Sequence, residues 1–364
     1  MSLDIVTLPL WQDQFGNAET ILASSGGMVA STFRFGTGVA ALRIRNEIGE
    51  IVLLPFQGQQ IWDAVFRGRR LTMVSMFDAP YPTQEYLKTY GAFFLHCGAT
   101  AMGNPGPADT HPLHGELPNA TYREAELLIG RDVSGAFMAL TGTYRHSVAF
   151  THNYIARPTI RLGAESGRIL LNMSIKNLKH GPMELMYLAH INFRPVDGAV
   201  LVDAVPDDLD HMLVRGVLPP ALPTPEHARF LASVRADPAI HRAIEPGRAI
   251  DPELVLALRC RAGADGWSHA LQVLPDGTAD FVSHRPDQLG HAVRWMTRNG
   301  DQEAIGVLLP STADADGYIA EKAKGNIIVL PPAGEFSFVL EFGALAAEGA
   351  RAMKSSIEAL RGKH

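Results

Sequence analysis

The sequence has little cysteine, no long apolar run and no leader-like N-terminus. Its two cysteines, Cys97 and Cys260, are too few for a disulfide framework and lack metal-type spacing, which is typical of a reducing compartment. No basic stretch followed by an apolar run opens the chain, so we expect no signal peptide. No segment reaches the roughly 18 apolar residues that a membrane span requires. These absences predict a cytoplasmic protein with no membrane partner.

Tracts of positive charge are also missing. The 364 residues include 32 basic and 38 acidic side chains, for a formal net charge of −6, and no Lys/Arg run stands out. A nucleic-acid partner is therefore not expected. Hydrophobic residues make up 46% of the chain and charged residues 19%, which is typical of a globular protein and too apolar for disorder.

Glycine and proline, in contrast, are abundant. The chain has 34 glycines and 24 prolines, together about one residue in six against a usual share of roughly 12%. Between residues 20 and 80 short β-prone runs alternate with turn residues, a pattern typical of antiparallel sandwiches. We therefore predict an all-β protein of mostly antiparallel strands with a few short helices.

The expected elements divide into strands and a few helical segments. A first helix is predicted at Pro82–Tyr90 with Thr83 as its cap, and a helical insertion at about 205–250 with Thr224 as cap and Pro225 in the first turn. A C-terminal amphipathic helix is predicted at about 345–360. We expect one domain over 1–364 with its core at about 20–342. The predicted strands are Ile21–Ser24, Met28–Phe35, Gly38–Arg45, Ile51–Pro55, Gln60–Phe66, Leu71–Phe77, Gly91–Thr100, Ala120–Ile129, Phe137–Arg145, His152–Leu162, Arg168–Asn177, Met183–Phe193, Leu254–Arg261, His269–Val273, Ala279–Ser283, Ile305–Pro310, Asn326–Leu330 and Phe336–Phe342.

Two polar segments interrupt this apolar, β-rich chain. The first, Asp109–Asn119, contains His111, His114 and Glu116. The second lies in an apolar strand, where alternation places His190 and Asn192 on one face. Burying such groups without partners costs about a few kcal/mol each. Either the first segment is a solvated loop, or the two segments form one cleft; we adopt the cleft as the working hypothesis.

Three motifs carry a resemblance to a known family. They are H-P-L-H-G-E-L-P-N from His111, Y-L-A-H-I-N-F-R-P from Tyr187 and P-P-A-G-E-F-S-F-V-L-E-F from Pro331. In order and spacing the chain resembles the aldose 1-epimerase (galactose mutarotase-like) superfamily over roughly residues 20 to 342, and looks most like a divergent bacterial branch of it. The resemblance implies a β-supersandwich fold, no cofactor, and a carbohydrate substrate whose ring is opened at the anomeric carbon. It makes His190 the general acid and places His114 near the sugar ring oxygen.

The chain departs from the family pattern at the general base. The expected glutamate position falls on about Leu309, so Glu116 and Asp314 become the candidate bases. General-base catalysis is typically worth about 10²- to 10⁴-fold. Two hypotheses follow: a sugar epimerase with a relocated base, or a non-catalytic carbohydrate-binding or sensing protein that has lost the base.

Further residues are candidates for contacts with sugar hydroxyl groups and apolar faces. Asp251 is a counterpart of a substrate-binding carboxylate of the family, and His96, which reads alternatively as a core histidine, lies near the place of a missing sugar-binding pair. A third hypothesis for the first polar segment is a metal site, although its spacing matches no metal motif, so none is predicted. We expect a monomer or homodimer. The candidate substrate-binding residues are Gln60, Trp62, His96, His111, Asn192, Arg194, Asp251 and Trp295.

Overall fold

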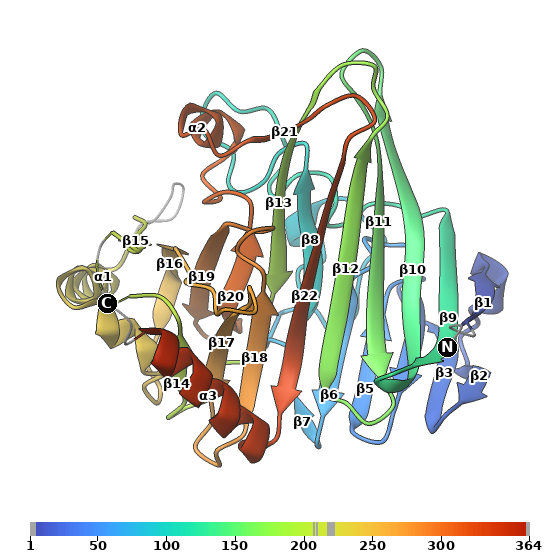
Figure 1. Ribbon diagram of the computed structural model, residues 1–364, viewed down its shortest axis with the longest axis horizontal. Helices are drawn as coiled ribbons and strands as arrows, with labels where there is room; N and C mark the ends of the chain where they lie inside the picture. The colour runs from blue at the N-terminus through green and yellow to red at the C-terminus, as the bar shows by residue number, and fades with distance from the viewer. Residues whose placement is uncertain (1–4, 207, 209, 217–222, 362–364) are drawn as a thin grey trace.

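Two large antiparallel β-sheets form most of the protein (Figure 1), in a computed structural model that describes residues 5–206, 208, 210–216 and 223–361. The first sheet has nine strands in the order β1-β9-β10-β11-β12-β22-β18-β17-β14. Its strands are β1 (Ile5–Leu10), β9 (Glu124–Asp132), β10 (Gly135–Val148), β11 (His152–Gly163), β12 (Arg168–Asn177), β22 (Glu335–Leu345), β18 (Ala279–His284), β17 (Ser268–Val273) and β14 (Val200–Asp203).

The second sheet has thirteen strands. Eleven follow the order β15-β16-β19-β20-β13-β8-β6-β5-β4-β3-β2, while β21 pairs with β13 and β7 pairs with β6. Its strands are β15 (Met212–Val214), β16 (Ile250–Leu258), β19 (His291–Arg298), β20 (Glu303–Ser311), β13 (Met183–Ile191), β8 (Phe94–Ala99), β6 (Ile61–Phe66), β5 (Gly49–Leu53), β4 (Ala40–Arg45), β3 (Met28–Arg34), β2 (Thr20–Ser25), β21 (Ile328–Leu330) and β7 (Arg69–Arg70).

The hydrophobic core lies between the two sheets. One continuous cluster of buried side chains contains residues of both, among them Leu42 of β4 and Tyr154 of β11. The rings of Phe94 on β8 and Phe342 on β22 lie 5.2 Å apart, centroid to centroid, and join the two layers. The prediction of an all-β, mostly antiparallel fold is therefore confirmed.

The helices lie outside this sandwich. Helix α3 (Ala347–Arg361) packs on the outer face of the first sheet, where Ala350 and Ile357 join a second hydrophobic cluster. Helix α1 (Pro225–Ala236) begins as the sequence predicted, with the Thr224 hydroxyl accepting a hydrogen bond from the His227 amide. Helix α2 (Tyr318–Ala323) and the short 3₁₀ turns at Gln12–Gln14, Tyr86–Lys88 and Pro238–Arg242 complete the helical segments.

Two predicted elements differ from the structure. Of the helix expected at Pro82–Tyr90, a single 3₁₀ turn forms, because the Thr83 hydroxyl accepts from the Glu85 amide two residues on and so closes a local turn. The strand expected at Leu71–Phe77 makes only isolated bridges from Thr72 and Val74. Strands β1, β7, β14, β15 and β19 had no counterpart among the predicted strands.

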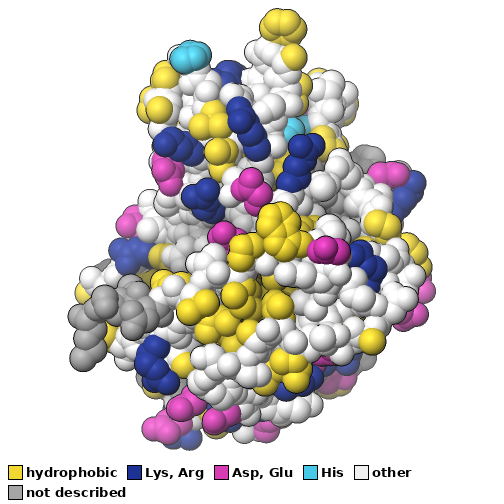
Figure 2. Space-filling model, turned by 90° about the vertical axis from the view of Figure 1, so that its right-hand side faces the viewer, with side chains coloured by type: hydrophobic (Ala, Val, Ile, Leu, Met, Phe, Trp, Pro, Cys, Tyr) yellow, Lys and Arg dark blue, Asp and Glu magenta, His cyan; other side chains and the backbone are white. Residues whose placement is uncertain are grey.

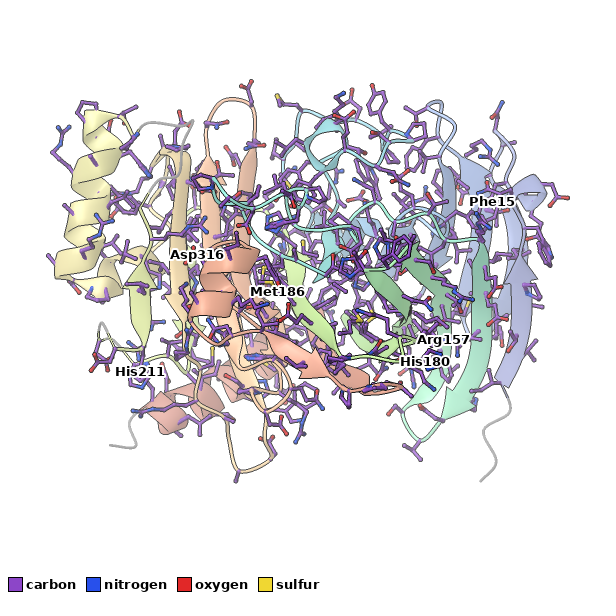
Figure 3. The ribbon with its side chains drawn as sticks, turned by 90° about the horizontal axis from the view of Figure 1, so that it is seen from above. Phe15, Arg157, His180, Met186, His211 and Asp316 are labelled. Carbon is purple, nitrogen blue, oxygen red and sulfur yellow. The ribbon has the colours of Figure 1, made fainter. Side chains whose placement is uncertain are left out.

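The predicted helical insertion at about 205–250 includes residues 207, 209 and 217–222, which lie outside the described residues. Its described part contains β15, α1 and a 3₁₀ turn. Seen from above, α1 lies at one end of the molecule, Phe15 lies at the other, and Met186 on β13 lies near the middle (Figure 3). Among the described helices, none combines the length and the apolarity that a membrane crossing would need.

The end of the molecule opposite α1 presents the open edges of both sheets, β1 and β2. Exposed hydrophobic side chains occur there at Ile5, Val6, Trp11 and Ile21. Figure 2 shows hydrophobic side chains gathered in the middle of this face, bordered by charged ones. Strand edges of this kind are places where sheets can pair with other chains.

Candidate active site

A cavity of about 220 Å³ is built on four neighbouring strands of the second sheet, β16-β19-β20-β13, and on the loops before and after β8. Strand alternation decides which side chains reach it. On β13, Leu188 and His190 line the cavity, whereas the preceding Tyr187 points to the first sheet, where its ring lies 4.6 Å from that of Phe338 on β22. The cavity is therefore on the face of the second sheet that points away from the first sheet.

His190 has a fixed orientation and a fixed tautomer. Its Nδ1 lies 2.8 Å from Asn192 Oδ1, and Asn192 Nδ2 donates to the Ala92 carbonyl at 2.9 Å. Because the amide nitrogen is committed to a carbonyl, the amide oxygen faces His190, and Nδ1 must carry the proton. The lone pair of His190 is therefore on Nε2, the nitrogen without a hydrogen-bond partner among the described residues.

Burial also keeps His190 uncharged. Desolvation lowers the pKa of His190 to about 4, although the hydrogen bond to Asn192 acts in the opposite direction. At neutral pH this imidazole is a proton acceptor through Nε2.

His114 faces His190 across the cavity. The two imidazole centroids are 5.4 Å apart and their planes are nearly perpendicular, at 89°. Burial, with the neighbouring His190, holds the pKa of His114 well below its usual value. Its enclosed Nδ1 has no partner among the described residues, and an enclosed N–H without an acceptor would be the worse arrangement. The favoured tautomer therefore carries its proton on Nε2.

The backbone at His114 is strained, and β8 holds it in place. His114 has φ 60°, in the left-handed region that costs a residue with a side chain about 1–3 kcal/mol. The Gly98 amide donates to the His114 carbonyl at 2.9 Å, and Gly98 O accepts from the amides of Glu116 and Leu117. A Cβ at Gly115 would lie 2.2 Å from the Ala101 carbonyl oxygen, so only glycine permits this close approach.

Glu116 is part of this clamp and does not line the cavity. Its carboxylate accepts from the amides of Ala99 and Thr100, each at 3.1 Å, from the Thr100 hydroxyl at 2.8 Å and from the Tyr154 hydroxyl. These four donors use the acceptor sites of a carboxylate. The assignment of Glu116 as a catalytic base is corrected accordingly: it holds the loop that presents His114.

The third side of the cavity carries the charges, on residues that the sequence analysis missed. Glu253 of β16 accepts from the Trp295 indole N–H at 2.7 Å and pairs with Arg215 at 3.4 Å. Arg215 also pairs with Asp316 at 3.4 Å. Trp295 was a predicted residue, and its ring lies 5.4 Å from that of His190. Glu253 directly precedes the predicted strand Leu254–Arg261 and shares the alternation of Val255, which was the signal available in the sequence.

Two tyrosines close the cavity as an aromatic wall. The Tyr86 ring lies 5.0 Å from His114, and the Tyr90 ring lies 6.0 Å from His190. Burial raises the pKa of both phenols well above the usual value, and the Glu253 charge adds to the effect. Both hydroxyls are therefore neutral at physiological pH.

Other predicted substrate contacts lie away from this cavity. His96 is fully buried beside Tyr187, whose hydroxyl is 2.6 Å from His96 Nδ1, and burial lowers the pKa of His96 to about 3. Gln60 is also buried and donates to the Pro118 and Asn119 oxygens, while Trp62 packs in the core.

The remaining predicted contacts are placed as follows. Asn192 lies beneath His190 and does not line the cavity. Arg194, on the segment after β13, and the exposed Asp251, on β16, also lie outside its lining.

Leu309, at the position where the family pattern has its general base, lies in the cavity wall. The other candidate base, Asp314, is elsewhere. Burial would raise the pKa of Asp314, but hydrogen bonds from His291 and Arg259 outweigh it and hold the pKa well below the usual range. Asp314 is therefore a structural partner of these two side chains and does not line this cavity.

The metal hypothesis joined Asp109, His111, His114 and Glu116. Asp109, His111 and Glu116 line a second cavity, while His114 lines the first. His111 Nδ1 lies 2.8 Å from the Pro112 carbonyl and its Nε2 accepts from the Tyr318 amide, so both ring nitrogens are engaged. Over the described ranges, no group of three or more His, Cys, Asp or Glu side chains could hold a metal ion.

Solved structures with the same architecture define the class of fold. A proposed aldose 1-epimerase from Klebsiella pneumoniae subsp. pneumoniae MGH 78578 superposes with a TM-score of 0.81 at 16% identity, over 99% of this chain and 96% of that one. A galactose mutarotase-like protein from Clostridium acetobutylicum gives 0.58 at 11% identity, over 88% and 99% of the two chains. The chain therefore has the fold of the aldose 1-epimerase and galactose mutarotase-like proteins, as its motifs predicted.

At the level of sequence families, residues 36–202 match the model of a domain of unknown function, DUF4432. That region contains His114 and His190 and ends before Arg215, Glu253 and Trp295. No curated protein matches the sequence. Likeness at these identities establishes the fold, and the chemistry must be argued from the site.

Proposed function

We propose that the cavity binds a small uncharged sugar and interconverts its anomers by opening and closing the ring. The observation that carries this proposal is the pair of neutral imidazoles, His114 and His190, facing each other 5.4 Å apart in one cavity. One presents a lone pair and the other an N–H, which are the two functions that a hemiacetal needs for proton transfer.

Size and charge limit the substrate. The cavity volume of about 220 Å³ is below the roughly 300–1,000 Å³ of sites for drug-sized ligands, which favours a single sugar ring. Its one cationic side chain in the described lining, Arg215, is already paired with Glu253 and Asp316. An anionic sugar would find no uncompensated positive charge there, so the substrate is a neutral monosaccharide.

His190 performs the proton transfer. Nε2 accepts the proton of the anomeric hydroxyl O1 as the bond from C1 to the ring oxygen breaks and C1=O1 forms. The resulting imidazolium gives this proton to the former ring oxygen. That oxygen and O1 were both bonded to C1 in the closed ring, so they lie close together and one nitrogen can serve both. After ring opening His190 is neutral again, and the proton of O1 has moved to the former ring oxygen. The reverse steps on the other face of C1 produce the second anomer.

In this order of steps His190 acts first as a base, whereas the resemblance implied that it acts as the general acid. His190 was expected to act first as the general acid, but the hydrogen bond to Asn192 leaves a lone pair on Nε2 in the resting protein. An imidazole that starts as a base needs no separate carboxylate. The apolar Leu309 at the family's base position is consistent with that chemistry.

His114 and Glu253 orient the ring. The His114 Nε2–H donates to the ring oxygen, where negative charge develops as the ring opens. Glu253 retains lone pairs beyond those used by Trp295 and Arg215 and accepts from a sugar hydroxyl. Its negative charge also stabilises the transient imidazolium on the neighbouring wall.

A second function is favoured by the same Leu309. If His190 cannot replace the missing carboxylate, the cavity would bind the sugar without converting it, as in a sensing protein. The two functions share the binding residues and differ only in turnover.

The test is anomer interconversion in freshly dissolved single anomers of neutral pentoses and hexoses, followed by NMR. We expect catalysis by the native protein, a loss of about 10²- to 10⁴-fold in His190→Gln, and native rates in the control His180→Gln, which changes an exposed turn histidine. Binding with no interconversion in the native protein would establish the sensing function. Neither binding nor interconversion of any neutral aldose would refute both.

A further inference from the structure

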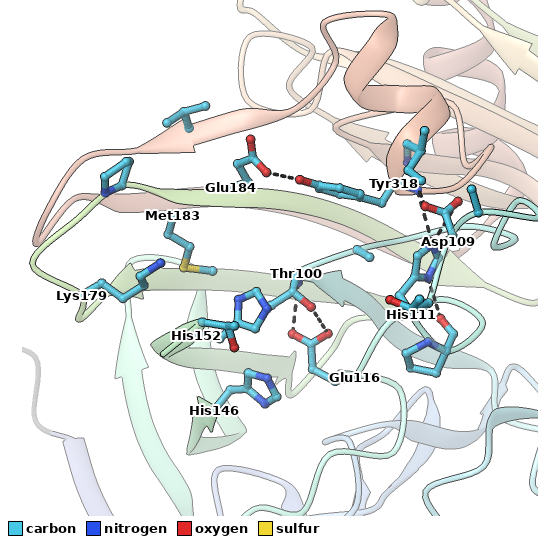
Figure 4. A pocket seen from close by; sticks show the side chains of 18 residues that line it. Thr100, Asp109, His111, Glu116, His146, His152, Lys179, Met183, Glu184 and Tyr318 are labelled. Carbon is cyan, nitrogen blue, oxygen red and sulfur yellow. Dashed lines mark hydrogen bonds and ion pairs between the residues drawn. The ribbon is translucent and has the colours of Figure 1, made fainter. Parts of the chain in front are cut away.

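A second and larger cavity, of about 670 Å³ (Figure 4), shares one loop with the first: residues 108–112 and Glu116 line the larger cavity, whereas Leu113 and His114 line the smaller one. It is bounded by β10 and β11 of the first sheet, by the turn from β12 to β13, and by helix α2. His146, His152 and Lys179 lie on one side, and Asp109, His111 and Tyr318 lie on the other. The proposed sugar site uses none of these residues.

The acceptors of this cavity are already engaged. Asp109 accepts from the Gly106 and Ile319 amides. Glu184 accepts from the Tyr318 hydroxyl and pairs with Lys322.

Glu116, between the two sides, is engaged as well, because it accepts from four neutral donors. A ligand rich in hydrogen-bond donors would therefore find few acceptors that are still available.

The donors on the opposite side, in contrast, are available. Lys179 Nζ forms no ion pair or hydrogen bond with another described residue, and His152 forms no side-chain hydrogen bond with one. His146 uses only Nδ1, 2.9 Å from the Tyr144 hydroxyl, which leaves Nε2. The rings of His146 and His152 are 5.9 Å apart. Three nitrogen groups from separate elements thus face one space without acceptors of their own.

We propose that His146, His152 and Lys179 form a binding site for a small organic anion, with a carboxylate or phosphate group held against their nitrogens. Charge-assisted hydrogen bonds from an ammonium and imidazoles are the usual way in which proteins hold such groups. The cavity is about three times the volume of the sugar cavity, so it can contain the rest of a metabolite-sized anion as well.

Binding of the anion is expected to promote protonation of His152. Burial lowers the pKa of His152, His146 and Lys179 lower it further, and the Glu116 carboxylate opposes them. A bound anion would add a second negative charge beside the ring and raise this pKa. The protonated form of His152 then contributes a positive charge that the empty site lacks. Affinity is therefore expected to increase from pH 7.5 to about pH 6.

The experiment is an NMR titration of the histidine ring protons of the full chain with inorganic phosphate and, separately, acetate. The resonances of His146 and His152 are assigned by their loss in His146→Gln and His152→Gln. We expect saturable shifts of both, with a dissociation constant near 1 mM for phosphate at about pH 6. Lys179→Met should weaken binding about tenfold or more. The control Lys354→Met, on the exposed surface of α3, should leave it unchanged.

The titrations distinguish a phosphate ligand from a carboxylate ligand, and they also show when the proposal fails. Saturation by phosphate alone assigns a phosphate ester, and saturation by acetate as well assigns carboxylates too. An adventitious, non-saturating response, or equal affinity in Lys179→Met, would overturn the proposal. So would saturable shifts with neutral sugars alone. None of these readouts depends on anomer interconversion, so the sugar-site proposal stands or falls separately.

Discussion

Neighbouring residues on β19 show two ways in which this protein buries polar groups. Arg294 points between the sheets and is fully buried, while Trp295 points to the sugar cavity. Arg294 donates to Asp203 at 2.7 Å, to His241 at 2.6 Å and to the Val307 carbonyl. Every donor group of Arg294 therefore has a partner inside the protein.

The cavity face is arranged differently. His190 has one nitrogen held by Asn192 and one nitrogen unoccupied, and Glu253 is held by two partners with capacity for another. Both sets of residues are oriented by hydrogen bonds, but the donors of Arg294 are all used, whereas His190 and Glu253 keep acceptor atoms free. A closed network specifies the packing, whereas a network with an open position can bind a ligand.

Acid destabilisation tests the shared property of the two faces, which is that both bury neutral histidines. Burial lowers the pKa of His190 to about 4 and that of His96, His241 and His284 to about 3. Histidines of the unfolded chain titrate near pH 6.5, so below that pH the unfolded chain binds more protons than the folded one. The free energy of unfolding therefore decreases as the pH is lowered. Between pH 7.5 and 5 we expect a loss of about 2 kcal/mol per histidine, measured by urea unfolding. A flat stability profile over this range would contradict the burial of neutral rings.

The closed network should fail when one charge is removed. Asp203→Asn removes the buried carboxylate that pairs with Arg294 and Arg242, which typically costs about 3–5 kcal/mol. The control Asp197→Asn breaks a half-exposed ion pair with Arg298 and should cost less than about 1 kcal/mol. Chemical denaturation measures both free energies. Equal losses in the two variants would show that the interior network is no more closed than the surface pair.

The open network should lose activity and keep stability. Glu253→Gln retains an oxygen for the Trp295 N–H but removes the charge. We expect kcat/KM for anomer interconversion to fall by about tenfold to a hundredfold, with a change in unfolding free energy near 1 kcal/mol. An unchanged rate would remove Glu253 from the site. A large loss of stability with an unchanged rate would show that Glu253 is a structural residue, like those of the Arg294 network.

Much of this arrangement was predictable from the sequence, and the reason is strand periodicity. His190 and Asn192 were placed on one face by alternation alone, and the loop around His114 by its concentration of polar side chains. Glu253 and Arg215 were not found, because each is one charged residue in a segment whose partners are distant in the chain. His96 and Trp62 looked like ligand contacts, yet residue type cannot reveal which side of a sheet faces a cavity.

The pH dependence of kcat/KM distinguishes the two possible starting roles of His190, and the change we expect in it is the smallest of these predictions. If Nε2 begins as a proton acceptor, the active form is the neutral ring. With a pKa of about 4, that form predominates above about pH 5. The rate kcat/KM should then vary by less than about twofold between pH 5.5 and 8 and decline only toward pH 4. If His190 began as the acid, the rate would fall about tenfold for each unit above pH 4, because only the protonated ring would be active. A profile of that second shape would return His190 to the acid role and require a separate base, for which Glu253 is the carboxylate in reach.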